Sequence, residues 1–402
     1  MPASPWLSIV GIGEDGASGL GDEAKRLIAG AEIVFGGRRH LELAASLIRG
    51  ESRPWPSPFS VEPVAALAGR QVCVLASGDP FLHGVGATLA RLVPADEMRV
   101  IPAPSALSLA AARLGWALQD ADTISLHGRA TSLIRPHLHP GRKLLCLTSN
   151  AEGPAAVAAL LTRLGFGPSR ITVLEALGGP RETIRSVRAD AFALQNINPL
   201  NLLAVEVESY PEAAILPLTP GLPDDFFEHD GQITKREIRA MTLSALAPRR
   251  GELLWDIGAG AGSIAIEWML ADPSMRAVAI EANPERAARI RRNAEALGVP
   301  SLELVEGAAP AVLAGLETPH AIFVGGGGSG PGVLEEAIEA LPSRGRLVAN
   351  AVTLEMEALL LARHADLGGD LIRIAVSRTA PVGSMTGWRA AMPVTQWTWV
   401  KP

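Results

Sequence analysis

One segment decides the fold of the second half of the chain: Leu253-Leu254-Trp255-Asp256-Ile257-Gly258-Ala259-Gly260-Ala261-Gly262. An apolar strand runs into a glycine-rich turn, and a helix is expected directly after it. Glycines let the backbone approach a ligand closely, and the helix N-terminus offers unpaired N–H groups. The next strand ends at Glu281, at the distance where an acidic side chain accepts hydrogen bonds from ribose hydroxyls. The pattern therefore predicts a nucleotide-binding turn; the alternative is a tight strand–helix turn without a ligand.

Composition narrows the class of protein. A chain of 402 residues predicts two or three domains at about 100–200 residues each. Apolar residues make up 48% and charged residues 19%, which excludes a disordered chain. The net charge of −6 disfavours a general nucleic-acid binder, which would need a basic surface. We expect no nucleic-acid partner, although a local basic patch for an acidic small molecule stays possible.

Two further features concern metals and membranes. Cys73 and Cys146 each lie in an apolar run, which is typical of buried strand positions. Two cysteines are too few for a disulfide framework, and no ligand cluster predicts a metal site. Residues 1–5 show no leader pattern, and no apolar run reaches about 18 residues. We therefore expect a cytoplasmic protein with no membrane association.

Apolar runs alternate with helical patterns throughout the first half. A proline-rich stretch between residues 210 and 223 breaks the pattern, because proline interrupts both helices and strands. We place domains at 1–210 and 223–402, with a linker at 211–222. The helices include 84–93, 104–114 and 153–164. The expected strands are 6–12, 31–35, 71–76, 98–101, 122–126, 142–148, 170–175 and 201–207.

The second half alternates more regularly, which predicts a parallel sheet covered by helices. Thr234 and Glu237 form a capping-box pattern at the start of a helix over 234–246. After residue 369, strands at about 370–377 and 389–400 follow one another without a helix, which predicts an antiparallel hairpin closing the sheet. The preceding strands are expected at 252–257, 276–281, 302–305, 320–324 and 345–350.

The glycine turn has the spacing Asp256-x-Gly258-x-Gly260-x-Gly262, which differs from the dinucleotide fingerprint. It resembles the class I S-adenosylmethionine methyltransferases, whose Rossmann-like seven-stranded, mostly parallel sheet also ends in an antiparallel hairpin. The resemblance implies contacts to the ligand's ammonium group from Asp256 and to its ribose from Glu281. The bare glycine run 325–328 after the fourth strand favours a bulky carbon acceptor over an amine; the alternative is a merely flexible loop.

The segment from 221 to 402, including Thr234-Lys235-Arg236-Glu237-Ile238-Arg239, resembles the precorrin-6 methyltransferases of cobalamin biosynthesis. This resemblance implies cofactor contacts from Thr234, from the glycine turn and from the backbone at Ala309. Glu355, beyond the fifth strand, is a candidate proton donor. The alternative is that Glu355 is a helix N-terminal glutamate favoured by the dipole. Arg378 and Arg389 are candidates for substrate carboxylates.

The first half carries three ordered motifs: Ser77-Gly78-Asp79-Pro80, Pro104-Ser105-Ala106 and Leu174-Glu175-Ala176-Leu177-Gly178. Their order resembles the tetrapyrrole methylase family, the class III methyltransferases, over about residues 5–210. That family has two α/β lobes with a folded cofactor between them. The resemblance implies cofactor contacts from the following residues: Gly78, Asp79, Leu82, Ser105, Ala106, Leu147 and Leu177.

Basic side chains near the expected cleft suit a substrate rich in carboxylates, because arginine binds carboxylates through two parallel hydrogen bonds. His127 and Arg129 follow a strand, and Arg38 opens the cluster Arg38-Arg39-His40. His127 is also a candidate catalytic residue. The alternative for each of these side chains is that it has a structural role or is simply exposed to solvent.

The combination of both halves resembles the decarboxylating precorrin-6 methyltransferases. This implies methylation at ring position 5 by the N-terminal domain and at position 15 by the C-terminal domain. It also implies loss of the ring C acetate carboxyl in the C-terminal domain, with precorrin-8 as product, one S-adenosylmethionine per domain, and a homo-oligomer. Three alternatives stay open: an RNA methyltransferase, a non-catalytic scaffold, and an NAD oxidoreductase.

Overall fold

The computed structural model describes residues 5–402, so the prediction made for the first residues of the chain concerns positions 1–4 that lie outside the described part. The chain divides into two compact units. Unit 1 holds the residues up to 131 together with 137–214, and unit 2 holds 132–136 together with 215–402. The domain limits 1–210 and 223–402, with the linker 211–222, stay predictions. No helix among the described residues is long and apolar enough to cross a membrane.

The first lobe of unit 1 is built on a parallel five-stranded sheet. Its strands are β1 (Leu7–Ile12), β2 (Ile33–Gly36), β3 (Glu51–Pro54), β4 (Val72–Ser77) and β5 (Met98–Ile101), in the order β3-β2-β4-β1-β5. Central strands β1 and β4 are apolar along nearly their whole length, as strands covered on both faces require. The helices are α1 (Asp22–Gly30), α2 (Arg38–Leu43), α3 (Glu62–Ala65) and α4 (Val85–Leu89).

The second lobe of unit 1 has a mixed five-stranded sheet in which only β6 and β7 pair in parallel. The elements are α5 (Ala106–Leu114), β6 (Ala121–Ser125), β7 (Lys143–Leu147), α6 (Gly153–Arg163), β8 (Arg170–Glu175), β9 (Thr183–Arg188) and β10 (Asn201–Glu206). The strand order is β6-β7-β10-β8-β9. Every strand predicted in this half is confirmed. Strands β3 and β9 were not predicted, because these largely exposed edge strands lack an apolar run.

Unit 2 contains the predicted seven-stranded, mostly parallel sheet. Its strands are β11 (Leu253–Ile257), β12 (Arg276–Glu281), β13 (Glu303–Glu306), β14 (Ala321–Val324), β15 (Arg346–Ala351), β16 (Asp370–Ile374) and β19 (Val394–Val400). The order is β13-β12-β11-β14-β15-β19-β16, and β19 runs antiparallel to both neighbours.

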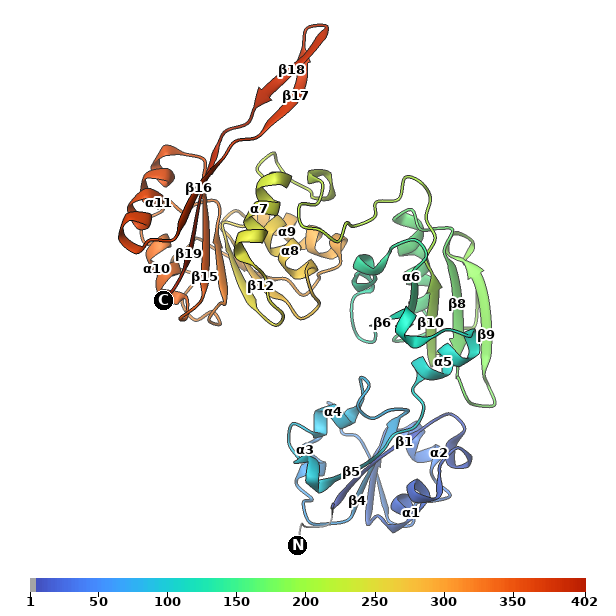
Figure 1. Cartoon of the computed structure of the whole chain (residues 1–402). Helices are drawn as coiled ribbons and strands as arrows, with labels where there is room; N and C mark the ends of the chain where they lie inside the picture. The colour runs from blue at the N-terminus through green and yellow to red at the C-terminus, as the bar shows by residue number, and fades with distance from the viewer. Residues whose placement is uncertain (1–4) are drawn as a thin grey trace. The chain divides into compact units, whose positions relative to one another are not determined.

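Helices cover both faces of this sheet (Figure 1). They are α7 (Arg236–Leu246), α8 (Ser263–Leu270) and α9 (Pro284–Leu297) on one face, and α10 (Val333–Ala340) and α11 (Leu354–Leu367) on the other. Alternate residues of β11 belong to the two apolar clusters: Leu254 packs with the α7–α9 side, and Trp255 packs with the α10–α11 side. The glycine turn after β11 is therefore held by a strand fixed on both faces.

Two local predictions in unit 2 are wrong. Thr234 does not cap α7, because Lys235 occupies the N-cap position and makes no capping hydrogen bond through its side chain. The strand expected over 389–400 is two strands, since Pro393 lacks the N–H needed to continue the ladder. Before the break, β17 (Ser377–Val382) and β18 (Met385–Ala390) form a two-stranded arm that extends beyond the main sheet (Figure 1).

Candidate functional site

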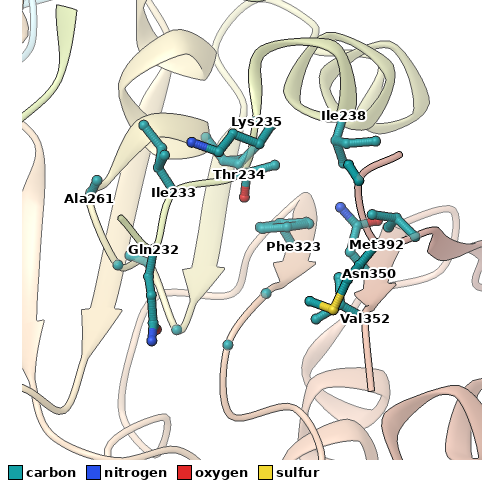
Figure 2. A pocket seen from close by; sticks show the side chains of 18 of the residues that line it. Gln232, Ile233, Thr234, Lys235, Ile238, Ala261, Phe323, Asn350, Val352 and Met392 are labelled. Carbon is teal, nitrogen blue, oxygen red and sulfur yellow. The ribbon is translucent and has the colours of Figure 1, made fainter. Parts of the chain in front are cut away.

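A pocket of about 650 Å³ opens at the carboxyl ends of β11, β14 and β15 in unit 2 (Figure 2). This is the edge of a parallel sheet where ligands bind in open α/β folds. Four groups of residues form its walls. They are 232–235 with Glu237 and Ile238, before and within α7; the turn 258–261 with Ile264; the strand ends at Phe323, Gly325, Gly326, Asn350, Val352 and Thr353; and the arm base at Val376, Arg378, Ala391, Met392 and Val394. Arg286 completes the lining.

The glycine turn needs glycine for steric reasons. Gly258 has a φ of +73°, and a Cβ at this position would overlap the carbonyl oxygen of Gly326 after β14. Gly260 has a φ of +60° and also lines the pocket. Gly262 is different, because it caps α8 and a Cβ there would press against Ile290 of α9. The first two glycines shape the pocket floor, whereas Gly262 lets two helices approach.

The two acidic residues of the predicted site lie behind this turn. Glu281 is buried, and its carboxylate accepts hydrogen bonds from the N–H groups of Gly260 at 2.8 Å and Asn283 at 2.9 Å. Asp256 is also buried; its Oδ2 accepts from the Ala265 N–H at 3.1 Å. Burial raises the pKa of Asp256 to about 7. Neither carboxylate belongs to the pocket lining: Glu281 holds the turn at Gly260, and Asp256 holds the first turn of α8 at Ala265.

The Asp256 Oδ1 atom is a buried oxygen with no hydrogen-bond partner within the part of the chain that the structure describes. A buried acceptor in that state favours a cationic or donor group nearby. Gly258 and Gly260 on the pocket floor leave room for S-adenosylmethionine to approach the backbone closely, whereas Asp256 lies outside the lining. The pocket volume also suits a ligand of that size.

Thr234 lies on the pocket wall, opposite Phe323 (Figure 2). Its position is fixed from behind by Arg239, a fully buried residue of α7 whose guanidinium donates to the Thr234 carbonyl oxygen. Arg239 also forms an ion pair with Glu267 of α8 at 2.5 Å. The segment before α7 is therefore tied to two helices at the place where it meets the pocket.

The other residues predicted in unit 2 are more dispersed. Arg378 lines the pocket and forms an ion pair with Glu237 of α7. Arg389 is directly opposite Arg378 in the arm, but it does not line the pocket. Glu355 is exposed in the first turn of α11, two residues beyond the lining residue Thr353. Ala309 packs against the apolar cluster on the α10–α11 side.

Unit 1 brings two predicted segments, the Gly78 loop and Pro104-Ser105, together at the ends of β4 and β5, beside the end of β1. Gly78 has a φ of +53°, and a Cβ there would meet the Pro104 carbonyl oxygen and the Ser105 Cα at 2.9 Å each. The Gly78 N–H donates to the Ile12 carbonyl oxygen at 3.2 Å. Asp79 accepts from the Phe81 N–H at 2.8 Å, which fixes the loop in which Leu82 is exposed.

The remaining predicted residues of unit 1 divide into buried and exposed ones. Ser105 caps α5 by accepting from the Ser108 N–H, and Ala106 is the exposed first residue of that helix. Leu177 and Leu147 pack in the apolar cluster of the second lobe. His127, Arg129 and Arg38 are exposed, and His127 Nδ1 lies 3.2 Å from the Thr148 carbonyl oxygen.

Several lining residues were not predicted. Phe323 is the next-to-last residue of β14, and Asn350 near the end of β15 is held by hydrogen bonds with Thr242 at 2.9 Å and Gln396 at 2.9 Å. Met392 comes from the arm base. Only Phe323 could have been found from the sequence, since it lies just before the glycine run. The pairing of β15 with β19 brings Asn350 and the segment before β19, which holds Met392, to the same pocket.

Comparison with known proteins gives two family matches. Residues 7–193 match the tetrapyrrole (corrin/porphyrin) methylases, and residues 225–401 match a precorrin methyltransferase domain. A precorrin-6Y C(5,15)-methyltransferase (decarboxylating) from Sinorhizobium sp. is 64% identical over 99% of this chain and 97% of its own. One from Mycobacterium tuberculosis is 42% identical over 98% of this chain and 100% of its own.

A shorter relative matches part of the chain. The probable cobalt-precorrin-6B C(15)-methyltransferase (decarboxylating) from Pyrobaculum calidifontis is 38% identical over 44% of this chain and 93% of its own. The full-length matches cover both units and agree with the fold described above. The chain therefore belongs to the family of decarboxylating precorrin-6Y C(5,15)-methyltransferases, which are S-adenosylmethionine-dependent C-methyltransferases.

Proposed function

We propose that the chain carries out two methylations and one decarboxylation of precorrin-6, giving precorrin-8. The N-terminal domain methylates ring position 5. The C-terminal domain methylates position 15 and removes the carboxyl group of the ring C acetate. The Pyrobaculum relative supports this division, because a protein matching less than half of this chain is named for position 15 and decarboxylation together. Each domain would bind one S-adenosylmethionine.

The character of the C-terminal pocket supports a carbon acceptor. Phe323, Val352 and Met392 give it apolar walls, and Gly258 and Gly260 keep its floor free of side chains. When bound, the cofactor supplies the electrophilic methyl group. An electron-rich ring carbon needs alignment and exclusion of water more than a strong base. The conjugated macrocycle itself can accept the electrons released by loss of carbon dioxide.

Most charged residues on the pocket wall already form ion pairs with other residues of the chain. Glu237 pairs with Arg378, and Arg286 donates to Asp230 at 2.9 Å. Glu355, two residues beyond the lining residue Thr353, is the proposed proton donor to the macrocycle in this domain. Arg378 and Arg389 are the proposed partners of substrate carboxylates.

In the N-terminal domain, the loop at Gly78 and the start of α5 form the proposed cofactor site. His127 is the proposed catalytic group there, and Arg129 and Arg38 are proposed to contact substrate carboxylates. The partner is a tetrapyrrole rich in carboxylates, with no nucleic acid. A cytoplasmic location and a homo-oligomeric state stay predictions from the sequence.

The observation that carries the proposal is the pocket at the ends of β11, β14 and β15, floored by Gly258 and Gly260. The test is incubation of the full chain with precorrin-6 and methyl-¹³C-labelled cofactor, with products analysed by mass and by NMR. We expect the mass of two methyl groups gained and one carbon dioxide lost, with label at positions 5 and 15. A product without label, or without loss of carbon dioxide, would contradict the proposal.

A pair of variants tests the division of labour. Gly258→Ala should abolish methylation at position 15 and decarboxylation while leaving methylation at position 5, because its Cβ would overlap Gly326. Gly251→Ala is the matched control, since Gly251 has a similar φ of +80° but no atom within 4 Å of the added Cβ. If Gly258→Ala removed both methylations and Gly251→Ala neither, the assignment of position 5 to the N-terminal domain would be wrong.

A further inference from the structure

A cluster of polar side chains lies at the ends of β1 and β4 in unit 1, beside the Gly78 loop. Arg39 of α2 is its centre. Its guanidinium forms an ion pair with Glu14, which follows β1, and donates to the hydroxyl of Ser77, the last residue of β4, at 3.1 Å. The same guanidinium lies 3.0 Å from His40 Nε2, and that nitrogen lies 2.8 Å from the Ser77 hydroxyl.

His40 adds no charge to this cluster. Arginine can only donate, so His40 Nε2 accepts and the ring proton is on Nδ1. Burial and the nearby Arg39 lower the pKa of His40 to about 4, so the ring is neutral at physiological pH. The neutral His40 ring therefore orients Arg39 and Ser77 and does not itself attract a ligand anion.

A second arginine reaches the same glutamate from the other lobe. Arg181, in the segment between β8 and β9, lies 3.8 Å from Glu14 Oε2. Gly179 permits this approach, because a Cβ there would come within 2.6 Å of Glu14 Cβ. The side chain of Glu14 is only 9% exposed, whereas those of Arg39 and Arg181 are 37% and 73% exposed. One nearly buried carboxylate thus holds two solvent-accessible cations.

We propose that Arg39 and Arg181 form a carboxylate-binding site of the N-terminal domain, which takes a peripheral carboxylate of the tetrapyrrole. The inference rests on the proposed function of this domain and adds the residues that select its substrate. Two guanidinium groups against one glutamate leave one positive charge, in a chain whose net charge is −6. Guanidinium groups match carboxylates in shape and hydrogen-bond geometry.

The position of the cluster supports this assignment. Ser77 directly precedes Gly78, so Arg39 lies at the start of the proposed cofactor loop. Arg181 has only a long contact to Glu14, which leaves most of its donors available. Arg38, the residue favoured by sequence, is exposed on the same helix, but the structure gives Arg39 the contacts to the β4 end.

The alternative is that the arginines only join loops of the fold. Kinetic measurements on variants of the full-length chain distinguish the two roles. For Arg181→Met we expect the KM for the tetrapyrrole in position 5 methylation to rise about tenfold, as loss of a charged hydrogen bond predicts. The kcat, the KM for the cofactor and the position 15 reaction should stay unchanged. Arg39→Lys should also raise the KM for the tetrapyrrole, because lysine keeps the charge but loses the planar set of donors that pairs with a carboxylate. Arg26→Met on α1 removes an exposed arginine outside the cluster; it is the control and should leave the KM for the tetrapyrrole unchanged.

Equilibrium binding separates failure of this inference from failure of the proposed function. The probes are uroporphyrin I, a stable tetrapyrrole with carboxylates on every ring, and its fully esterified form. Arg181→Met should weaken binding of the acid but not of the ester, even if the enzyme made no methylated product. Equal binding of the acid by wild type and Arg181→Met, or an unchanged KM in an active enzyme, would overturn the inference.

Discussion

Arg239 provides the most demanding test of how unit 2 is held together. Its guanidinium is fully buried and donates to Glu267 and to the carbonyl oxygens of Thr234 and Leu222. It also stacks over the ring of Phe227 at 4.8 Å. In Arg239→Met all of these polar contacts are lost while the apolar volume is partly kept.

The expected cost follows from what is left behind. Glu267 still accepts from the N–H groups of Gly221 at 2.6 Å and Leu222 at 3.0 Å, but it loses its cation. Burial already raises the pKa of Glu267, so its charged form depends on Arg239. Removing one partner of a buried pair typically costs about 3–5 kcal/mol. Arg239→Met/Glu267→Gln should recover part of this loss, because no uncompensated charge then remains buried.

Hydrogen exchange measured by mass spectrometry is the appropriate assay, because a chain of two units need not unfold in one step. We expect the opening free energy of peptides from 236–246 and 263–270 to fall by the amount above, with unit 1 unchanged. Arg250→Met is the control: the Arg250 side chain is 87% exposed, so its loss should change stability by no more than ~0.5 kcal/mol. Equal effects of Arg239→Met and Arg250→Met would refute the reasoning.

Three further predictions follow from burial and pocket geometry. Burial raises the pKa of Asp256 from 3.8 to about 7, so folded unit 2 retains a proton that the unfolded chain has lost. The stability of unit 2 should therefore fall as the pH rises from 3.8 through about 7. In thermal melts, Asp256→Asn should make the melting temperature depend less on pH over this range. Thr234→Val should weaken cofactor binding about fivefold in calorimetry, as loss of one hydrogen bond predicts. Burial raises the pKa of both cysteine thiols to about 12, so neither should react with a disulfide reagent until the protein is denatured.

The sequence predicted most of the sheet strands, for a physical reason. Strands buried on both faces appear as continuous apolar runs, as in β4 and β11, and these were located to within a residue or two. The exposed strands β3 and β9 have no such run. The arm was missed because β18 and β19 are separated only by a short break at Pro393, which a propensity pattern merges into one strand.

The candidate site was predictable only where one segment carries it. Thr234, Gly258 and Gly260 belong to local motifs, and the structure places all three in the pocket lining. Asn350 and Met392 reach the pocket through strand pairing between distant segments, which spacing along the chain does not reveal. The choice between Arg38 and Arg39 depends on which face of α2 meets β4, and six residues of helix give too little periodicity to decide it.

The place of β19 in the sheet has a consequence for synthesis on the ribosome. β19 comes after β16 in the chain, yet it lies between β15 and β16. Until residues 394–400 have emerged, β16 has no partner and one edge of β15 stays open, with the arm synthesised in the interval. At about 5–20 residues per second this lasts on the order of seconds, long enough for an open edge to pair with another nascent chain. We therefore expect the yield of folded protein to depend on chaperones more than its final stability would suggest.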